Sequence, residues 1–179
     1  MKQETIIAQP VIETPRMLLR PLRNADAGLM RLYAGDRRVA EMTTHIPHPY
    51  PPGAAETLIA QSTRADREAF SWAMDGSEAG GAEFLGLITL QQLDRDQTEI
   101  AFWVAPTMWN TGFASEAVRA LIAAIPLASQ TIFASVFQDN PGSARVLTNA
   151  GFDYLGDAEA FSVARGAKVA TWTYLKRLA

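Results

Sequence analysis

The fold of this chain is constrained above all by two helix patterns in its second half, each of which follows directly on a strand pattern. From Gly112 onward, apolar residues recur at helical spacing until Pro126 interrupts them. Residues 131–137 form an apolar, β-rich run, and Asn140 followed by Pro141 is typical of a helix start. Strands that alternate with helices in this way pair in parallel. Part of the sheet is therefore expected to be parallel.

The earlier strand patterns are separated by turns alone, which indicates antiparallel pairing. Residues 70–74, 84–93 and 98–105 are β-rich runs of this kind. The remaining predicted elements are a strand at 17–22, a helix that Asn24 caps, a loop at 46–53 stiffened by four prolines, a helix at 54–68, and closing strands at 152–156 and 169–177. The chain is thus predicted to be an α/β protein (an α+β mixed sheet) in the order β-α-α-β-β-β-α-β-α-β-β.

The composition is that of a folded globular protein and removes several classes of function. The 179 residues suit a single domain, with residues 1–12 as a loosely ordered N-terminal extension. The chain has no cysteine and only two histidines, so a disulfide framework and a thiolate site are excluded and no metal is expected. A net charge of −3 without a basic block gives no electrostatic footprint for nucleic acid, and no nucleic-acid partner is expected.

No stretch of the sequence has the pattern of a targeting or membrane-spanning segment. Residues 1–8 contain Glu4 and lack the apolar core of a signal peptide. The longest uncharged apolar run, residues 120–129, contains Pro126 and is shorter than the roughly 20 residues needed to cross a bilayer. We expect a soluble, cytoplasmic protein with no membrane partner.

The stretch from Trp109 to Glu116 joins a strand to the first turn of a helix and is the best candidate for a ligand site. Amides at a helix start lack intrahelical partners, and the helix dipole adds positive potential there, so such a start attracts anions. Gly112 allows the main chain to approach a phosphate closely, and Asn110 tolerates a left-handed backbone. Neither a Walker loop nor Gly-x-Gly-x-x-Gly occurs in the sequence. The alternative is a plain helix start capped by water.

A second strand-to-helix junction, from Asn140 to Phe152, completes a resemblance to a known family. The two junctions resemble the GNAT superfamily of acyl-CoA-dependent N-acyltransferases and, within it, the RimJ/RimL-like branch of ribosomal-protein N-terminal (alanine/serine) acetyltransferases. The family pattern Q/R-x-x-G-x-G/A falls on residues 109–114, with tryptophan first as in this branch. The closing Asn-x-x-Ser…Gly-Phe falls on Asn140, Ser143, Gly151 and Phe152, and residues 13–20 look like the branch's opening strand. The resemblance implies a central, mostly antiparallel sheet with a splayed parallel pair, flanked by helices.

The resemblance also implies acetyl-CoA as cofactor, CoA as product, and no metal. The pyrophosphate is expected on the amides of residues 110–114, and the pantetheine arm along the exposed edge of the strand at 99–105. Asn110 stands where the family usually has glycine, which weakens binding if only glycine fits there. The expected cofactor-binding residues are Phe102, Trp103, Val104, Trp109, Asn110, Thr111, Gly112, Phe113, Ala114, Ser115 and Asn140.

Direct transfer from thioester to amine, which the resemblance implies, needs an acid for the departing thiolate and a route for the amine proton. Leu147 replaces the family's usual tyrosine acid, and Ser143 is expected to substitute for it. The alternative for Ser143 is a bond to its own backbone. Glu99 is the candidate base, and the alternative is a solvent-facing carboxylate with water as the base. A main-chain N–H near Trp103 or Val104 is expected to stabilise the oxyanion.

The sequence determines the acceptor side less closely. His45, His48 and Tyr50 lie in or beside the proline-stiffened loop, which lines the acceptor cleft in relatives, and Trp72 is a further candidate. Their ordinary alternatives are surface histidines and packed aromatics. Residues 161–166 are expected to complete the cleft or to form a dimer contact, with Arg165 as easily a solvated charge.

Several alternatives stay open at this point. The acceptor amine is a protein N-terminus or a small molecule, and the chain is a monomer or a homodimer. A catalytically degenerate acyl-CoA-binding regulatory module is the main rival to an acetyltransferase, with Asn110 and Leu147 as losses of function. A nucleotide-phosphate binder that uses the same helix start is the third reading.

Overall fold

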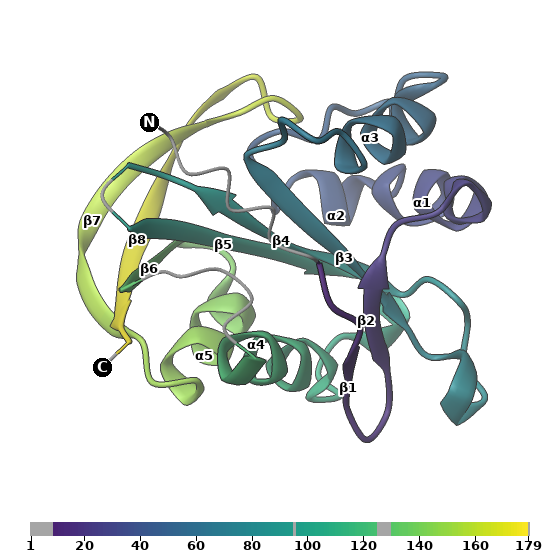
Figure 1. Cartoon of the computed structure of the whole chain (residues 1–179). Helices are drawn as coiled ribbons and strands as arrows, with labels where there is room; N and C mark the ends of the chain where they lie inside the picture. Colours follow the sequence, from purple (N-terminus) through teal and green to yellow (C-terminus); the bar gives the residue numbers. More distant parts are fainter. Residues whose placement is uncertain (1–8, 95, 125–129, 179) are drawn as a thin grey trace.

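The computed structural model describes residues 9–94, 96–124 and 130–178 (Figure 1). In this part of the chain, eight strands form one sheet in the order β1-β2-β3-β4-β5-β6-β8-β7. The strands are β1 (Ile12–Glu13), β2 (Leu18–Pro21), β3 (Ala69–Asp75), β4 (Gly86–Gln92), β5 (Gln97–Val104), β6 (Thr131–Phe137), β7 (Asp153–Ser162) and β8 (Ala167–Arg177). The α-helices are α1 (Ala27–Ala34), α2 (Arg37–Ala40), α3 (Ala54–Ser62), α4 (Phe113–Ala124) and α5 (Pro141–Asn149).

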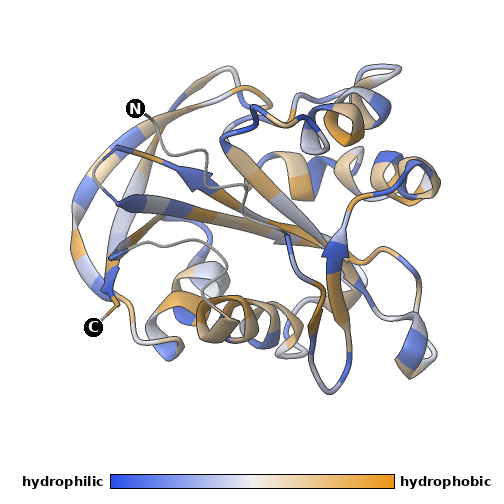
Figure 2. Ribbon diagram, viewed as in Figure 1, coloured by the Kyte–Doolittle hydropathy of each residue, from blue (hydrophilic) through white to orange (hydrophobic). Residues whose placement is uncertain are grey.

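Helices cover both faces of the sheet, so the core has two layers. Helices α4 and α5 lie on one face and α1 to α3 on the other (Figure 1). The first layer packs residues such as Ile100 and Leu121 beneath α4 and α5, and the second packs Trp103 and Met30 beneath α1 to α3. Strand β5 contributes to both layers because successive side chains point to opposite faces. Figure 2 shows the resulting apolar stretches on the central strands and a more mixed β7–β8 hairpin.

Strands β5 and β6 form the one parallel pair among the described strands, and they separate after three residue pairs. Their pairing runs from Gln97 with Thr131 to Glu99 with Phe133, although β5 continues to Val104 and β6 to Phe137. The other neighbouring strands pair antiparallel. This arrangement confirms the expected mixed sheet with a splayed parallel pair.

Most element boundaries agree with the sequence, and three differ for physical reasons. Asn24 does not cap α1, because it begins a short 3-10 helix (Asn24–Asp26) and Asp26 accepts from the Arg23 amide at 2.9 Å. Helix α3 was expected to run to residue 68 but ends at Ser62. The Ser62 hydroxyl donates to the Ile59 carbonyl in this last turn. Strand β7 is longer than expected because β8 pairs with it along its length.

The sequence also led to expectations about the N-terminal extension, the helix stop at Pro126 and the absence of a membrane-spanning segment. Part of the expected N-terminal extension is held in place, since the Pro10 carbonyl accepts from Trp72 Nε1 at 2.9 Å. Residues 1–8 and Pro126 lie outside the described residues. None of the described helices is both long and apolar enough to cross a membrane.

Candidate functional site

The loop before helix α4 has the backbone shape expected of an anion cradle. Asn110 and Gly112 both adopt left-handed conformations, with φ of 60° and 78°. The Gly112 carbonyl accepts from the Glu116 amide at 3.0 Å, so the helix begins immediately after the glycine. The amides of the first turn therefore have no intrahelical partner and carry the positive end of the helix dipole. Asparagine is one of the few residues other than glycine that tolerates this geometry.

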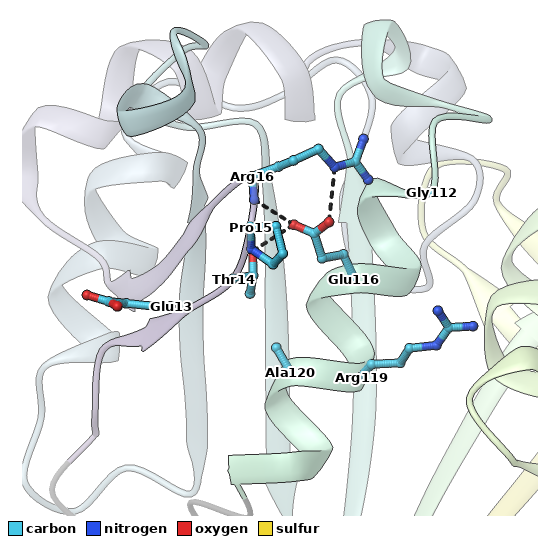
Figure 3. Close-up of a pocket in the computed structure, with 8 residues that line it drawn as sticks. All are labelled: Glu13, Thr14, Pro15, Arg16, Gly112, Glu116, Arg119 and Ala120. Carbon is cyan, nitrogen blue, oxygen red and sulfur yellow. Dashed lines mark hydrogen bonds and ion pairs between the residues drawn. The ribbon is translucent and has the colours of Figure 1, made fainter.

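Arg16 fixes this loop from the side of the β1–β2 connection, a role that sequence reasoning missed. Its Nη1 donates to the Thr111 carbonyl at 3.1 Å and its Nε to Glu116 at 3.0 Å, and its guanidinium lies 5.6 Å from the Phe113 ring centroid. Figure 3 shows the guanidinium bent toward Gly112 at the rim of an open pocket beside α4. The signal in the sequence is the Thr-x-Arg of the opening strand, whose Thr14 hydroxyl also bonds Glu116.

Trp109, the first residue of the expected motif, links the end of β5 to helix α2. Its indole Nε1 donates to the Val104 carbonyl at 3.0 Å. The Arg38 guanidinium lies 5.6 Å from its ring centroid, within the range of a cation–π contact. The ring stays 39% exposed, so one face of Trp109 is open beside the cradle.

The main chain of β5 presents alternate residues to the gap between β5 and β6. The Ala105 amide donates to the Leu85 carbonyl at 2.8 Å, and bonding along an antiparallel pair alternates from residue to residue. The main-chain groups of Trp103 therefore point to β4, and those of Phe102 and Val104 point to the side of β6. Because the strands separate there, the main-chain groups of Phe102 and the Val104 amide face the gap, whereas the Val104 carbonyl accepts from Trp109.

Helix α5 begins beside the end of β6 with the Asn140 cap that the sequence predicted, and the structure pairs Asn140 with Ser143. Asn140 caps the helix through its Oδ1, which accepts from the Ser143 amide at 3.3 Å, and its Nδ2 lies 3.0 Å from the Ser143 hydroxyl. Ser143 is half-buried. Leu147, one turn later, is fully buried in the core and presents nothing to a cleft.

Glu99 stands on β5 at the last residue pair before the strands separate. Its side chain is exposed, yet enough protein surrounds it that desolvation raises the pKa of its carboxyl. It shares a face of β5 with Trp103, on the side of α1 to α3. The Glu99 carboxyl is therefore accessible to solvent and also partly desolvated by the protein around it.

The four residues expected on the acceptor side are two histidines of the proline-stiffened loop and two aromatic residues that pack against the core. His45 is exposed, and desolvation lowers the pKa of its imidazole. His48 is half-buried, and its Nδ1 is buried without a hydrogen-bond partner in the described protein. Tyr50 packs against the second core layer, and Trp72 is completely buried in the first. Burial therefore gives Trp72 a packing role and removes it from any cleft.

The turn between β7 and β8 docks on the loop after α2, and Arg165 makes the connection. Arg165 is not a solvated charge, because both its Nη atoms bind the Asp139 carboxylate, at 2.6 and 3.0 Å. These hydrogen bonds lower the pKa of the Asp139 carboxyl. The Val163 amide in the same turn donates to the Thr44 carbonyl at 3.1 Å. Sequence reasoning missed Asp139, whose only signal is its place immediately before Asn140.

The structure thus brings together two sets of the expected residues. Trp109 meets Val104 beside the cradle, and Asn140 meets Ser143 at the start of α5. In the described part of the chain, no cluster of three or more histidine, aspartate and glutamate side chains could hold a metal ion.

Known proteins resemble this chain in sequence and in fold. Residues 16–153 match the acetyltransferase (GNAT) domain family. The chain is 25% identical over 174 residues to the uncharacterized N-acetyltransferase YoaA of Bacillus subtilis (strain 168), a match that covers 92% of this chain and 95% of YoaA.

Two solved structures show the likeness in fold. RimL, a ribosomal L7/L12 α-N-protein acetyltransferase solved with coenzyme A, superimposes with a TM-score of 0.80 at 12% identity, over 94% of this chain and 98% of RimL. The spermidine N-acetyltransferase of Vibrio cholerae, solved with CoA and spermine, gives a TM-score of 0.72 at 18% identity, over 90% and 96% of the two chains. The neighbours therefore include an enzyme of the expected ribosomal-protein branch. The family match spans well over half of the sequence, and the chain belongs to the GNAT acetyltransferase family.

Proposed function

We propose that this protein transfers an acetyl group from acetyl-CoA to a primary amine within a ternary complex. The observation that carries the proposal is the separation of β5 from β6 after Glu99 and Phe133, with the starts of α4 and α5 beside the gap. A gap of this kind leaves main-chain donors and acceptors for an amide-bearing arm. RimL and the spermidine enzyme, which share the fold, are both solved with CoA.

The residues present fit acetyl-CoA. The left-handed conformations of Asn110 and Gly112 turn the loop so that the first amides of α4 face outward, where they would hold the pyrophosphate. The main chain of Phe102 and Val104 faces the gap and would hold the pantetheine arm. The Val104 amide is the better donor toward the acyl oxygen, because the main chain of Trp103 points to β4 and that of Val104 to the gap.

Ser143 and Glu99 carry the two proton transfers in this proposal. Acetyl-CoA supplies an activated acetyl group, which the amine nitrogen takes up as the thiol leaves. Ser143 would donate a proton to the departing sulfur, with Asn140 Nδ2 holding its oxygen at 3.0 Å. Glu99 would accept the amine proton, because desolvation raises the pKa of its carboxyl toward the range of a working base.

Calorimetric titration with acetyl-CoA tests the cofactor site. We expect saturable binding that the double variant Asn140→Ala, Gly112→Trp loses. Gly80→Trp is the matched control, since Gly80 shares the left-handed conformation with φ of 83° and an added Cβ meets nothing within 4 Å. A wild-type chain that binds ATP or NAD in thermal-shift measurements and does not bind acetyl-CoA would replace the proposal with a nucleotide-phosphate binder.

Thiol release from acetyl-CoA with a panel of amines separates the enzyme from a binding module. Release that depends on an added amine supports acetyl transfer. Binding of acetyl-CoA with no release for peptides or small amines would indicate the degenerate regulatory module. The panel includes both acceptor classes, since RimL acts on a protein and the V. cholerae enzyme is named for spermidine.

A further inference from the structure

We infer that Arg165 is a positioning residue that holds the acceptor-side wall against the start of helix α5. The wall consists of two segments, the loop at 41–48 and the turn at 162–166. The inference rests on the proposed function, because it assigns the acceptor to this wall and the reacting groups to Asn140 and Ser143.

The contact between Arg165 and Asp139 is geometrically demanding. Two parallel N–H···O bonds join the guanidinium to the carboxylate, at 2.6 and 3.0 Å, and the Arg165 side chain is only 21% exposed. A fork of this kind fixes both distance and orientation, which a single charge cannot do. Asp139 directly precedes Asn140, so the fork fixes the main chain that carries the helix cap.

The third nitrogen of the same guanidinium binds the other segment of the wall. Arg165 Nε donates to the Glu41 carbonyl at 2.9 Å, at the end of α2. Arg165 Cζ lies 5.0 Å from the ring centroid of Phe137, the last residue of β6. One side chain therefore joins the end of α2, the end of β6 and the β7–β8 turn, which are far apart in the sequence.

The rest of the turn supports this arrangement. The Val163 amide donates to the Thr44 carbonyl, next to His45, and the Arg165 amide is bonded to the Ser162 hydroxyl at 3.2 Å. Figure 1 shows the β7–β8 hairpin curving over the sheet toward α2 and α3. The Val163 contact joins the turn to the loop at 41–48, whereas the Arg165 fork joins the turn to Asp139, directly before α5.

This geometry predicts a larger effect on the acceptor than on the cofactor. The cradle at residues 109–116 is held by Arg16 and Glu116, which do not contact Arg165 in the described contacts. Loss of the fork would let the wall and Ser143 shift relative to each other. Small shifts of reacting groups cost large factors in rate, whereas the cradle would keep its shape.

Steady-state kinetics of Arg165→Ala and Arg165→Lys with the best acceptor of the wild-type protein test the inference. We expect Arg165→Ala to lower kcat/KM for the amine about thirtyfold and to weaken acetyl-CoA binding much less, by about threefold, because the fork holds only the main chain before Asn140 and the Asn140 side chain remains. Arg165→Lys keeps the charge but loses the fork, so its kcat/KM should lie between the values of Arg165→Ala and the wild-type protein. The control is Arg64→Ala, which removes an exposed Arg–Asp fork in the turn after α3 that has no described contact with Arg165, and it should change neither constant.

A purely structural role for Arg165 gives a different result. It would lower the melting temperature of Arg165→Ala while kcat/KM, measured well below that temperature, stays at the wild-type value. Equal losses in acceptor kcat/KM and acetyl-CoA binding would also overturn the inference, because the wall would then not be separate from the cradle.

Hydrogen exchange tests the fork without any activity. In Arg165→Ala and Asp139→Asn, the amides of Val163 and Ser143 should exchange about tenfold faster, while Glu116 keeps its protection. Unchanged exchange at both amides would overturn the inference. A wild-type protein that acetylates no amine would instead refute the proposed function, and these exchange rates would still report on the fork.

Discussion

The proposed cofactor side and the proposed acceptor side of this protein are built in different ways. On the cofactor side, main-chain geometry would make the site, with left-handed Asn110 and Gly112 before α4 and main-chain groups of Phe102 and Val104 that face the gap. On the acceptor side, side chains of a proline-rich loop and a hairpin turn would make it, and Arg165 joins these two segments. Cofactor binding should therefore depend on backbone conformation, and acceptor selection on individual side chains.

The two sides also differ in how completely their polar groups are satisfied. Arg16, Thr14 and Glu116 bond one another beside the cradle, so the charges there are paired. On the acceptor side, His48 keeps a buried nitrogen without a protein partner, and Glu99 is desolvated without an ion pair in the described contacts. Unsatisfied and desolvated groups are common where a substrate must bind.

Glu99→Gln should give the largest effect, a loss of about 100-fold in kcat/KM at neutral pH, if a base is required. A base works when deprotonated, so the wild-type kcat/KM should rise with pH through the raised pKa of Glu99 and level off above it. The variant should lose this acidic limb. The pH profile of thiol release measures both the loss in kcat/KM and the acidic limb.

Glu159→Gln is the matched control for this change, since Glu159 is an exposed carboxylate on the edge strand β7. It should leave the profile unaltered. If Glu99→Gln keeps both the rate and the acidic limb, the proton leaves to water and Glu99 is a solvent-facing strand residue.

Ser143→Ala should lower kcat about twentyfold while acetyl-CoA binding stays within about twofold. Asn140 still caps α5 in this variant, because its Oδ1 accepts from the Ser143 amide and not from the hydroxyl. The effect should shrink for thioesters whose thiol is more acidic, because such a thiolate leaves without an acid. Equal losses for all thioesters would assign Ser143 to helix structure alone.

Much of the cofactor side could be predicted from the sequence because it depends on local rules. The Asn140–Pro141 helix start and the left-handed Asn110 and Gly112 are properties of residue types at adjacent positions. The parallel pair followed from a strand, helix, strand order. The sequence could not place the Arg16 and Arg165 contacts, which join residues 100 and 26 positions apart.

The proposed acceptor side was predicted less well, because it also depends on contacts between residues that are far apart in the sequence. Trp72 looked like a cleft aromatic, but its position on β3 turns it into the core, where Pro10 accepts its indole N–H. Strand alternation gives two faces, and in a sheet covered by helices on both sides it does not say which face is open. Glu99 is exposed although it shares a face of β5 with the buried Trp103, a difference along one strand that alternation does not predict.

Arg16→Lys should weaken acetyl-CoA binding about fivefold and leave the acceptor KM unchanged. Lysine keeps the positive charge but lacks the separate, coplanar nitrogens through which Arg16 bonds the Thr111 carbonyl and Glu116, so the loop is held less firmly. Calorimetry measures the Kd. The matched control is Arg23→Lys, whose guanidinium bonds Glu83 at an exposed site away from the cradle. A loss in Arg16→Lys that appears only in acceptor KM would contradict the division into two sides.

His48→Phe should give the smallest effect, a gain of about 1 kcal/mol in the free energy of unfolding. The substitution removes a buried nitrogen that has no protein partner and keeps an aromatic ring of similar shape. Urea denaturation measures the gain, and His45→Phe, at an exposed side chain, should show none. A loss of stability in His48→Phe would mean that Nδ1 is bonded in solution, so the acceptor side would be as fully satisfied as the cradle. A gain accompanied by a higher acceptor KM, with the acetyl-CoA Kd unchanged, would identify His48 as a residue whose hydrogen bond is reserved for the amine substrate.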